Sequence, residues 1–321
     1  AFIIEETKNL LAIDSPSGMT KKAAEHVAAR FEALGYAPQT TRKDGVLVCL
    51  GGRDRENGLL LEAHMDTLGG MVCQIKANGR LKITPIGGLR AENVETENCR
   101  VVTKFDGVIE GTAQLINAST HVNEKYADTQ RTFDTVEIVL DEPVADAEDV
   151  KKLGVRTGDY VCFEPRTRVT QSGYIKSRFL DDKLSVGILL GYAKYLKDEQ
   201  ITPERAVYVH ITSFEEVGHG GSASVPAGVT EAISVDMGCV GEGLTCDERM
   251  VSICAKDSGG PYHYDVVRGL IAAAEKMGAP YAVDVYPRYG SDVEATLRAG
   301  YDIRHGLIGS CLLYTSDAAD E

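Results

Sequence analysis

The sequence predicts an α/β fold: a mixed sheet covered by helices on both faces, with a small β-rich domain inserted into it. Two observations lead to this prediction. Before residue 68 and after residue 165, apolar strand-like runs alternate with amphipathic helical segments, which is the pattern of an α/β domain. Between these positions, short strand-like runs are separated by tight turns such as Asn78-Gly79 and Asp106-Gly107, which is typical of a small β barrel or sandwich.

The α/β part begins with two helices and two strands. We expect helices over 2–12 and 20–34 and strands over 46–50 and 59–63. Gly35 stands where the second helix should end. After residue 165 we expect helices over 184–196, 264–277 and 291–300 and strands over 206–211, 232–236, 250–254 and 281–285. These elements suffice for one central sheet with helices on both faces.

The inserted part is mostly β-structure. Its expected strands cover 71–75, 81–84, 100–105, 108–115, 136–140 and 160–163, and a helical period occurs only near 146–153. Because this pattern interrupts the α/β alternation, we expect residues 68–165 to form a domain of their own.

Composition narrows the class of protein. The chain has 321 residues, and its net charge of -14 argues against nucleic acid or an anionic membrane as a partner. No apolar run approaches the roughly 18 residues of a membrane span, and the N-terminus lacks the pattern of a signal peptide. The eight cysteines have no metal-type spacing, and several lie in apolar runs. We therefore expect buried free thiols in a cytoplasmic protein.

Polar side chains gather where the α/β strands end. They are His64 with Asp66, Asp181 with Asp182, Glu215 with Glu216, and Asp236. Each has an ordinary structural explanation as a sheet-edge histidine, a helix cap, a solvated strand end or a turn residue. Ligands of open α/β sheets bind beyond the carboxyl ends of the strands, and imidazole with carboxylates suits zinc, cobalt or manganese. Taken together, these residues favour a metal hydrolase.

Four motifs in order resemble one known family. They are Ala63-His64-Met65-Asp66, Phe179-Leu180-Asp181-Asp182-Lys183, Phe214-Glu215-Glu216-Val217-Gly218 and Val235-Asp236-Met237-Gly238. The order, the spacing and the inserted domain resemble the dinuclear-metal aminopeptidases, which include the glutamyl, leucyl and deblocking aminopeptidases and the tetrahedral (TET) peptidases. The resemblance extends from near Leu10 to about Gly309. It implies a metallo-exopeptidase domain at 1–67 and 166–309, with an inserted PDZ-like or barrel-like dimerisation domain.

The resemblance also implies a role for each motif residue. His64 and Asp236 would hold one divalent metal ion, Glu216 would hold a second, and Asp181 would bridge the two. Two zinc or cobalt ions per subunit, with manganese as an alternative, would activate a water molecule against the first peptide bond of short peptides. Glu215 would act as general base, and Asp66 would accept the ring N–H of His64 and fix its tautomer. The Asp181–Asp182 peptide bond would be cis.

The resemblance further implies a homodimer, formed through the inserted domain, that assembles into a hollow dodecamer. Strand edges exposed in that domain would otherwise favour aggregation. One departure concerns the end of the chain. The family has a further histidine ligand after the segment that corresponds to 304–309, whereas here no histidine follows His305. We therefore expect residues 310–321 not to match the family, with His305 and His219 as the nearest substitutes.

Two other functions remain open at this stage. One is a non-catalytic shell or binding subunit, left inert by the missing ligand. The other is a glycosidase of the cellulase type that uses Glu215 and Glu216 as its carboxylate pair, although such enzymes need no metal and would leave His64 and Asp236 without a role. The preferred N-terminal residue is not predicted. The loop 289–292 and the turn at 308–309 are candidate pocket residues, and Asp292 could instead be a helix cap.

Overall fold

The computed structural model describes residues 1–313, which form two compact units. The α/β unit comprises 1–67 and 167–313, and the second unit comprises 68–166. Within the described residues, no helix is both long and apolar enough to cross a membrane. The predicted tail, residues 310–321, lies partly outside this range, because residues 314–321 are not described.

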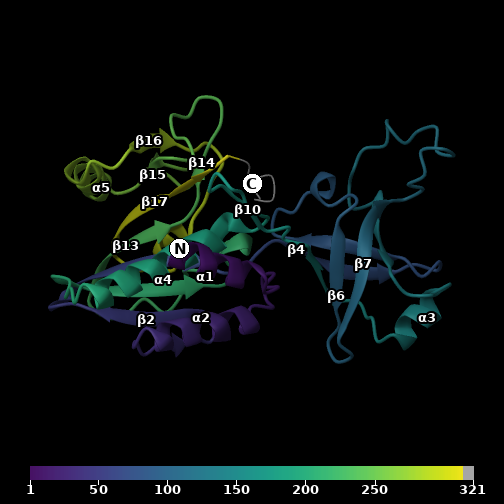
Figure 1. The fold of residues 1–321 in the computed structure, drawn as a ribbon, viewed down its shortest axis with the longest axis horizontal. Helices are drawn as coiled ribbons and strands as arrows, with labels where there is room; N and C mark the ends of the chain where they lie inside the picture. The colour runs from purple at the N-terminus through teal and green to yellow at the C-terminus, as the bar shows by residue number, and fades with distance from the viewer. Residues whose placement is uncertain (314–321) are drawn as a thin grey trace. The chain divides into compact units, whose positions relative to one another are not determined.

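A nine-stranded mixed sheet forms the centre of the α/β unit (Figure 1). Its order is β1-β2-β12-β3-β13-β17-β15-β16, and β14 pairs with β17. The strands are β1 (Gln39–Thr40), β2 (Val46–Gly51), β3 (Asp54–His64), β12 (Arg205–Thr212), β13 (Val229–Val235), β14 (Gly238–Cys239), β15 (Val251–Lys256), β16 (Tyr281–Val285) and β17 (Arg304–Leu312). Strands β12, β3, β13 and β17 run parallel, whereas β2 and β15 pair antiparallel to β12 and β17. A separate hairpin joins β10 (Arg168–Val169) to β11 (Ile175–Lys176).

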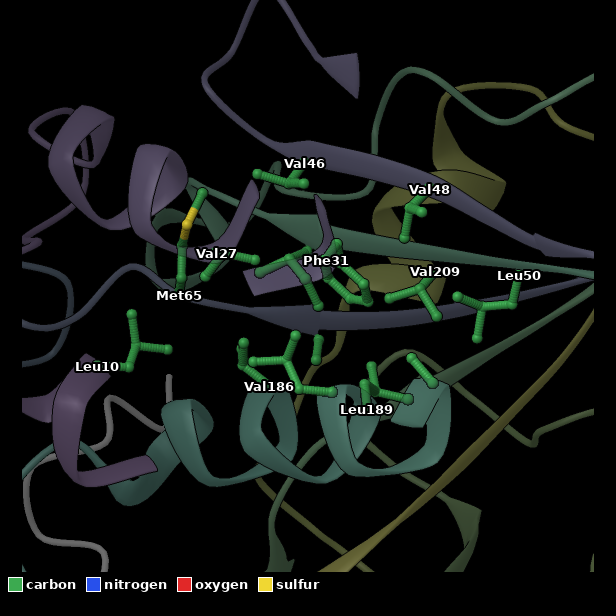
Figure 2. Packing of buried hydrophobic residues seen from close by; sticks show 14 of the residues in the cluster. Leu10, Val27, Phe31, Val46, Val48, Leu50, Met65, Val186, Leu189 and Val209 are labelled. Atoms are coloured by element: carbon green, nitrogen blue, oxygen red, sulfur yellow. The ribbon is translucent and has the colours of Figure 1, made fainter. Parts of the chain in front are cut away.

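Helices cover both faces of this sheet. They are α1 (Phe2–Leu11), α2 (Lys21–Ala33), α4 (Leu180–Asp198), α5 (Tyr264–Met277) and α6 (Asp292–Arg298). In one apolar cluster, Phe31 of α2 and Val186 of α4 pack against Val209 of β12 (Figure 2). The other cluster joins Val293 of α6 to Leu60 of β3. Because successive strand residues point to opposite faces, the two clusters lie on opposite sides of the sheet. The predicted fold class is confirmed.

Strand β17 is longer than the sequence pattern indicated. It continues through Leu312, with Ser310 opposite Val251 of β15 and Cys311 opposite Gly238 of β14. The boundary expected at Gly309 therefore falls inside a strand. This pairing also brings Cys311 to Cys246, and the two form a disulfide across 65 residues of sequence. The expectation of free thiols is wrong for these two cysteines, because sequence spacing does not reveal which strands become neighbours.

The second unit is a closed six-stranded barrel with the order β4-β5-β8-β7-β6-β9. Its elements are β4 (Gly69–Ile75), β5 (Leu81–Ile86), a 3-10 turn (Ala91–Asn93), β6 (Asn98–Val102), β7 (Val108–Leu115), β8 (Val136–Leu140), α3 (Ala147–Lys152) and β9 (Tyr160–Phe163). Fully buried Val72, Val101 and Ile138 fill its interior. Strand β9 pairs with both β4 and β6, which closes the barrel. The exposed strand edges expected in this region are therefore absent from the six described strands, since closure pairs each strand on both sides.

Candidate metal centre

The candidate site lies at the carboxyl ends of three adjacent parallel strands. Strand β3 ends at His64, which pairs with Thr212 at the end of β12. On its other side, β3 pairs with β13, where Ser234 lies opposite Glu62. Asp236 follows two residues later, at the level of His64. Parallel pairing thus brings side chains from distant parts of the sequence to one edge of the sheet.

The two acidic pairs share an unusual local backbone. Phe179 precedes Leu180, Asp181 and Asp182 with a φ of 62°, and Phe214 precedes Glu215 with a φ of 68°. A bulky residue rarely adopts this left-handed conformation, and such residues cluster at functional sites. Within α4, Asp181 and Asp182 have non-helical backbone angles, and the peptide bond between them is cis, as predicted. Neither pair is therefore part of a regular helix or strand.

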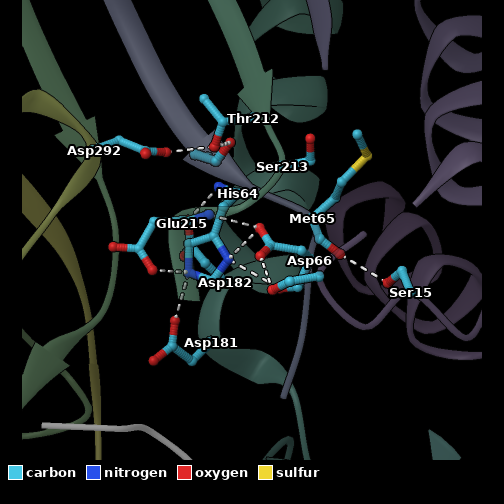
Figure 3. Close-up of polar contacts among 12 residues, drawn as sticks. Ser15, His64, Met65, Asp66, Asp181, Asp182, Thr212, Ser213, Glu215 and Asp292 are labelled. Atoms are coloured by element: carbon cyan, nitrogen blue, oxygen red, sulfur yellow. Dashed lines mark hydrogen bonds and ion pairs between the residues drawn. The ribbon is translucent and has the colours of Figure 1, made fainter. Parts of the chain in front are cut away.

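His64 is the central residue of the site (Figure 3). It is 1% exposed. Its Nε2 lies 3.0 Å from Oδ1 of Asp181 and 3.6 Å from Oε2 of Glu215. On the other side of the ring, Nδ1 lies 3.0 Å from the backbone oxygen of Asp66 and 3.6 Å from its carboxylate Oδ1. The carbonyl is therefore the nearer acceptor for the ring N–H, although the sequence pointed to the carboxylate.

The carboxylate of Asp66 instead links His64 to the loop that carries Glu215. It is fully buried, and its Oδ1 accepts a hydrogen bond of 3.2 Å from the backbone N–H of Glu215. Its Oδ2 accepts from the hydroxyl of Ser17 at 2.5 Å. Asp66 thus contacts both the histidine and the backbone of the proposed base.

Two groups of side chains have the arrangement of a metal site, and they share His64. One is His64 with Asp182 and Asp236, and the other is His64 with Asp181 and Glu216. Within each group, one ligand atom per residue lies within 4.8 Å of the others. Sequence reasoning gave no ligand role to Asp182, although its place in the second motif was a signal. Asp182 thus shares a metal-type group with Asp236, whereas Asp181 shares the other group with Glu216.

Burial and mutual repulsion together raise the pKa values of the acidic side chains at this site. Burial, followed by the charge of Asp181, raises the pKa of Asp236 to about 7. The same two causes raise the pKa of Glu216 well above its usual value. Burial lowers the pKa of His64, but the carboxylates of Glu215 and Asp181 outweigh it and raise that pKa.

These shifts test whether the residues fit a metal ion. Buried acids that face one another cannot all be ionised unless a positive charge lies among them. A divalent cation supplies that charge and is often the largest local charge in such a site. Imidazole with several carboxylates is a donor set that suits zinc, cobalt or manganese. The residues present therefore fit divalent metal ions.

The two substitute histidines lie apart from these groups. His305 is near the start of β17, opposite Ala232, whereas the site lies beyond Val235 and its partner Ile308. Its ring packs on Tyr262. His219 is exposed and stacks on Phe214. Neither belongs to a metal-type group within residues 1–313.

Comparison with known proteins identifies the family. The family model for the M42 glutamyl aminopeptidases matches residues 44–318. The chain belongs to the M42 family. Its predicted membership is thereby confirmed, and with it the class of hydrolase, an aminopeptidase. The family match continues past the Gly309 boundary that the motifs suggested.

Individual relatives are named as aminopeptidases, and solved structures share the fold. YhfE of Bacillus subtilis (strain 168), which is named as an aminopeptidase, is 41% identical over 306 residues, 95% of this chain and 88% of that protein. The glutamyl aminopeptidase of Lactococcus lactis is 24% identical over 226 residues, 68% of this chain and 61% of that protein. An aminopeptidase structure from the archaeon Desulfurococcus kamchatkensis has a TM-score of 0.87 at 23% identity, covering 98% of this chain and 88% of that one. The dodecameric PhTET1-12s structure has a TM-score of 0.83 at 23% identity, covering 98% and 92%.

Proposed function

We propose that this chain is a metal-dependent aminopeptidase that uses two divalent ions to remove the N-terminal residue of peptides. One observation carries the proposal: in an M42 chain, two metal-type groups adjoin each other and share His64. Zinc or cobalt fits the mixed imidazole and carboxylate donors, and manganese is the alternative.

Different residues of the chain would hold the two ions. His64 and Asp236, with Asp182 beside them, would hold one ion, and Asp181 and Glu216 would hold the second. When bound, the ions would supply Lewis acidity that polarises the peptide carbonyl and makes a water molecule acidic enough to react near neutral pH. Asp181, whose Oδ1 is 3.0 Å from the shared histidine, would bridge the two ions.

Glu215 is the proposed general base. Its Oε2 lies 3.6 Å from Nε2 of His64, and its side chain is 17% exposed, so it faces the ligands and remains accessible. It belongs to neither metal-type group of the described residues, so its carboxylate remains available to accept a proton. We propose that it takes this proton from the attacking water and passes it to the leaving amine. The hydrogen bond from its backbone N–H to Asp66 holds it in place.

We further propose a cytoplasmic homodimer that assembles to a dodecamer. The support is the likeness to a neighbour described as a dodecamer. Because the barrel is closed, exposed strand edges no longer support this assembly. Exposed apolar side chains of the barrel unit do support it: Phe105 is 79% exposed and Val122 is 72% exposed. Light scattering at micromolar concentration should give at least the mass of a dimer. A monomer at every concentration would refute the assembly.

The activity is tested with aminoacyl p-nitroanilides, before and after dialysis against a chelator. We expect hydrolysis that is lost with the metal and returns on adding zinc or cobalt, with elemental analysis giving two ions per chain. Activity that survives complete metal removal would contradict the proposal.

Two other functions serve as outcomes of the same test. A solved neighbour from Thermotoga maritima is described as an endoglucanase, at 18% identity and a TM-score of 0.70, which shows the shared fold alone. Hydrolysis of a soluble cellulose derivative by the metal-free chain would favour the glycosidase. A chain that binds metal but cleaves neither substrate would be the non-catalytic subunit.

A further inference from the structure

Both glutamates of the site lie on one loop, which we call the acidic loop and define as residues 213–220. It begins after Thr212, the last residue of β12. At its other end, Gly221 lies against α6 in space. Within it, Glu215–Val217 form a single 3-10 turn, and Phe214 and Gly218 on either side have positive φ angles. The position of Glu215 and Glu216 therefore depends on what holds the two ends of this loop.

One buried carboxylate connects those ends. Oδ2 of Asp292 accepts a short hydrogen bond from the hydroxyl of Thr212, and Oδ1 accepts one of 2.6 Å from the backbone N–H of Gly221. Asp292 is 3% exposed and is the first residue of α6. Both bonds run to groups outside that helix. The alternative role of a simple helix cap does not account for them.

Thr296, one turn further along α6, contacts the carbonyl group of the same glycine. Its hydroxyl lies 2.7 Å from the carbonyl oxygen of Gly221 and 3.1 Å from Oε2 of the buried Glu62. The packing here is close. A Cβ atom on Gly220 would lie 2.2 Å from Oδ1 of Asp292, and one on Gly221 would lie 2.6 Å from the hydroxyl of Thr296. These two glycines therefore let the loop approach α6 closely enough to bond with it.

The hairpin between β1 and β2 contacts the acidic loop as well. Nζ of Lys43 donates to the carbonyl oxygens of His219 and Gly220, the latter at 3.1 Å. The hydroxyl of Ser213 in turn donates to the carbonyl oxygen of Lys43. The loop is thus bonded to two elements that are separated from it in the sequence.

We propose that Asp292 is a positioning residue, which fixes the acidic loop and thereby the carboxylates of Glu215 and Glu216. The inference rests on the proposed function for its effect on turnover. Its effect on the loop stands independently of that function. The two carboxylate oxygens of Asp292 accept from Thr212 and from Gly221 separately, so this one residue can close both ends of the loop. A displacement of about 1 Å at a catalytic group can cost roughly a hundredfold in rate.

The variants that test the role of Asp292 differ in which of its hydrogen bonds they keep. Asp292→Ala removes both bonds. Asp292→Asn keeps the shape: its oxygen can accept from Gly221, and its amide can donate to Thr212, whose hydroxyl then turns to the carbonyl of Ala63, 3.4 Å away. Thr212→Val removes only one of the two bonds that Asp292 accepts, so it replaces the alanine variant if that one does not fold. Arg298→Ala, on the same helix with a side chain 68% exposed, is the matched control.

The first readout is hydrogen exchange of the whole chain, which needs no activity. In Asp292→Ala we expect amides of 213–221 to exchange at least about tenfold faster, with those of 186–196 in α4 unchanged. We expect Asp292→Asn and Arg298→Ala to match the parent. Exchange that rises equally in both segments, or an asparagine variant as fast as the alanine one, would show a merely structural residue and overturn the proposal.

The second readout separates kcat from KM. We expect Asp292→Ala to lower kcat roughly a hundredfold and to change KM little, with Asp292→Asn restoring kcat. A loosened loop with unchanged kcat would overturn the positioning role while the aminopeptidase stands. If the parent chain has no peptidase activity, the proposed function fails instead. Titration with cobalt alone then decides: weaker cobalt absorption in Asp292→Ala, recovered in Asp292→Asn, supports positioning, and identical titrations refute it.

Discussion

The barrel unit and the carboxyl edge of the α/β sheet place acidic side chains in opposite electrostatic environments. In the barrel unit, Glu95 forms an ion pair with Arg131 at 2.7 Å, and this bond lowers the pKa of Glu95. At the edge of the α/β sheet, Asp236 faces Asp181, and burial together with that charge raises the pKa of Asp236 to about 7. The barrel neutralises its acid with a cation of the chain. The sheet edge gathers acids that a bound cation would neutralise.

Topology explains the difference. Neighbouring barrel strands are antiparallel, so their carboxyl ends alternate between the two rims, and the inward side chains are apolar. Strands β3, β12 and β13 are parallel and end side by side. Buried acids persist there at a cost to stability, and perturbed acids of this kind cluster at functional sites. The contrast yields four predictions, from the largest expected effect to the smallest.

The largest effect is expected at the proposed base. Glu215→Gln should lower kcat by roughly 100–10,000-fold and leave the metal content near that of the parent, because the proposed base accepts a proton from water and belongs to neither metal-type group of the described residues. Steady-state kinetics and elemental analysis measure both. Glu95→Gln in the barrel is the matched control and should leave kcat unchanged. Turnover above a tenth of the parent rate in Glu215→Gln would end the assignment.

Removing a proposed shared ligand should affect the metal itself. Asp181→Ala should weaken metal binding by more than the roughly 10–100-fold typical of residues that only support a ligand, because the proposed bridge would hold both ions. Elemental analysis after gel filtration should then show most of the metal lost. If two ions per chain remain, Asp181 is not the bridge.

A lysine in each unit provides a closer comparison. Lys43 donates to loop carbonyls and lies 5.9 Å from the ring of Phe214, whereas Lys104 donates to the carbonyl of Gly158 and lies 4.7 Å from the ring of Tyr160. We expect Lys43→Ala to lower kcat by about tenfold, since each hydrogen bond contributes modestly. Lys104→Ala should leave kcat alone. Equal effects of the two variants on kcat would show that contact type, and not location, matters.

The smallest effect concerns the stability of the barrel unit and depends on pH. Because the folded state lowers the pKa of Glu95, its ionised form stabilises the fold above the usual pKa of 4.5, and this contribution is lost as the pH falls below it. Glu95→Gln should therefore reduce the free energy of unfolding by about 1 kcal/mol at pH 7. Denaturant titrations at pH 7 and at low pH measure this. A difference that grows towards low pH would contradict the sign.

The sequence by itself determined the elements and the chemistry of the site residues. Helix and strand periods are local properties of a few neighbouring residues, so α2, β12 and α5 could be predicted to within a few residues. The motifs around His64 and Glu215 likewise stand in continuous stretches, and their order was enough to predict the family.

Only the tertiary structure decided which distant residues meet. Strands and helices that are far apart in the sequence pair with one another and bring these residues together. This pairing closes the barrel, forms the Cys246–Cys311 disulfide and places Asp182 in one metal-type group with Asp236. Asp292 is the clearest case: its sequence neighbours suggest a helix cap, whereas its partners Thr212 and Gly221 are 80 and 71 residues away. Such contacts form because burial leaves a carboxylate no water to bond with, so it must take the donors that the fold brings within reach.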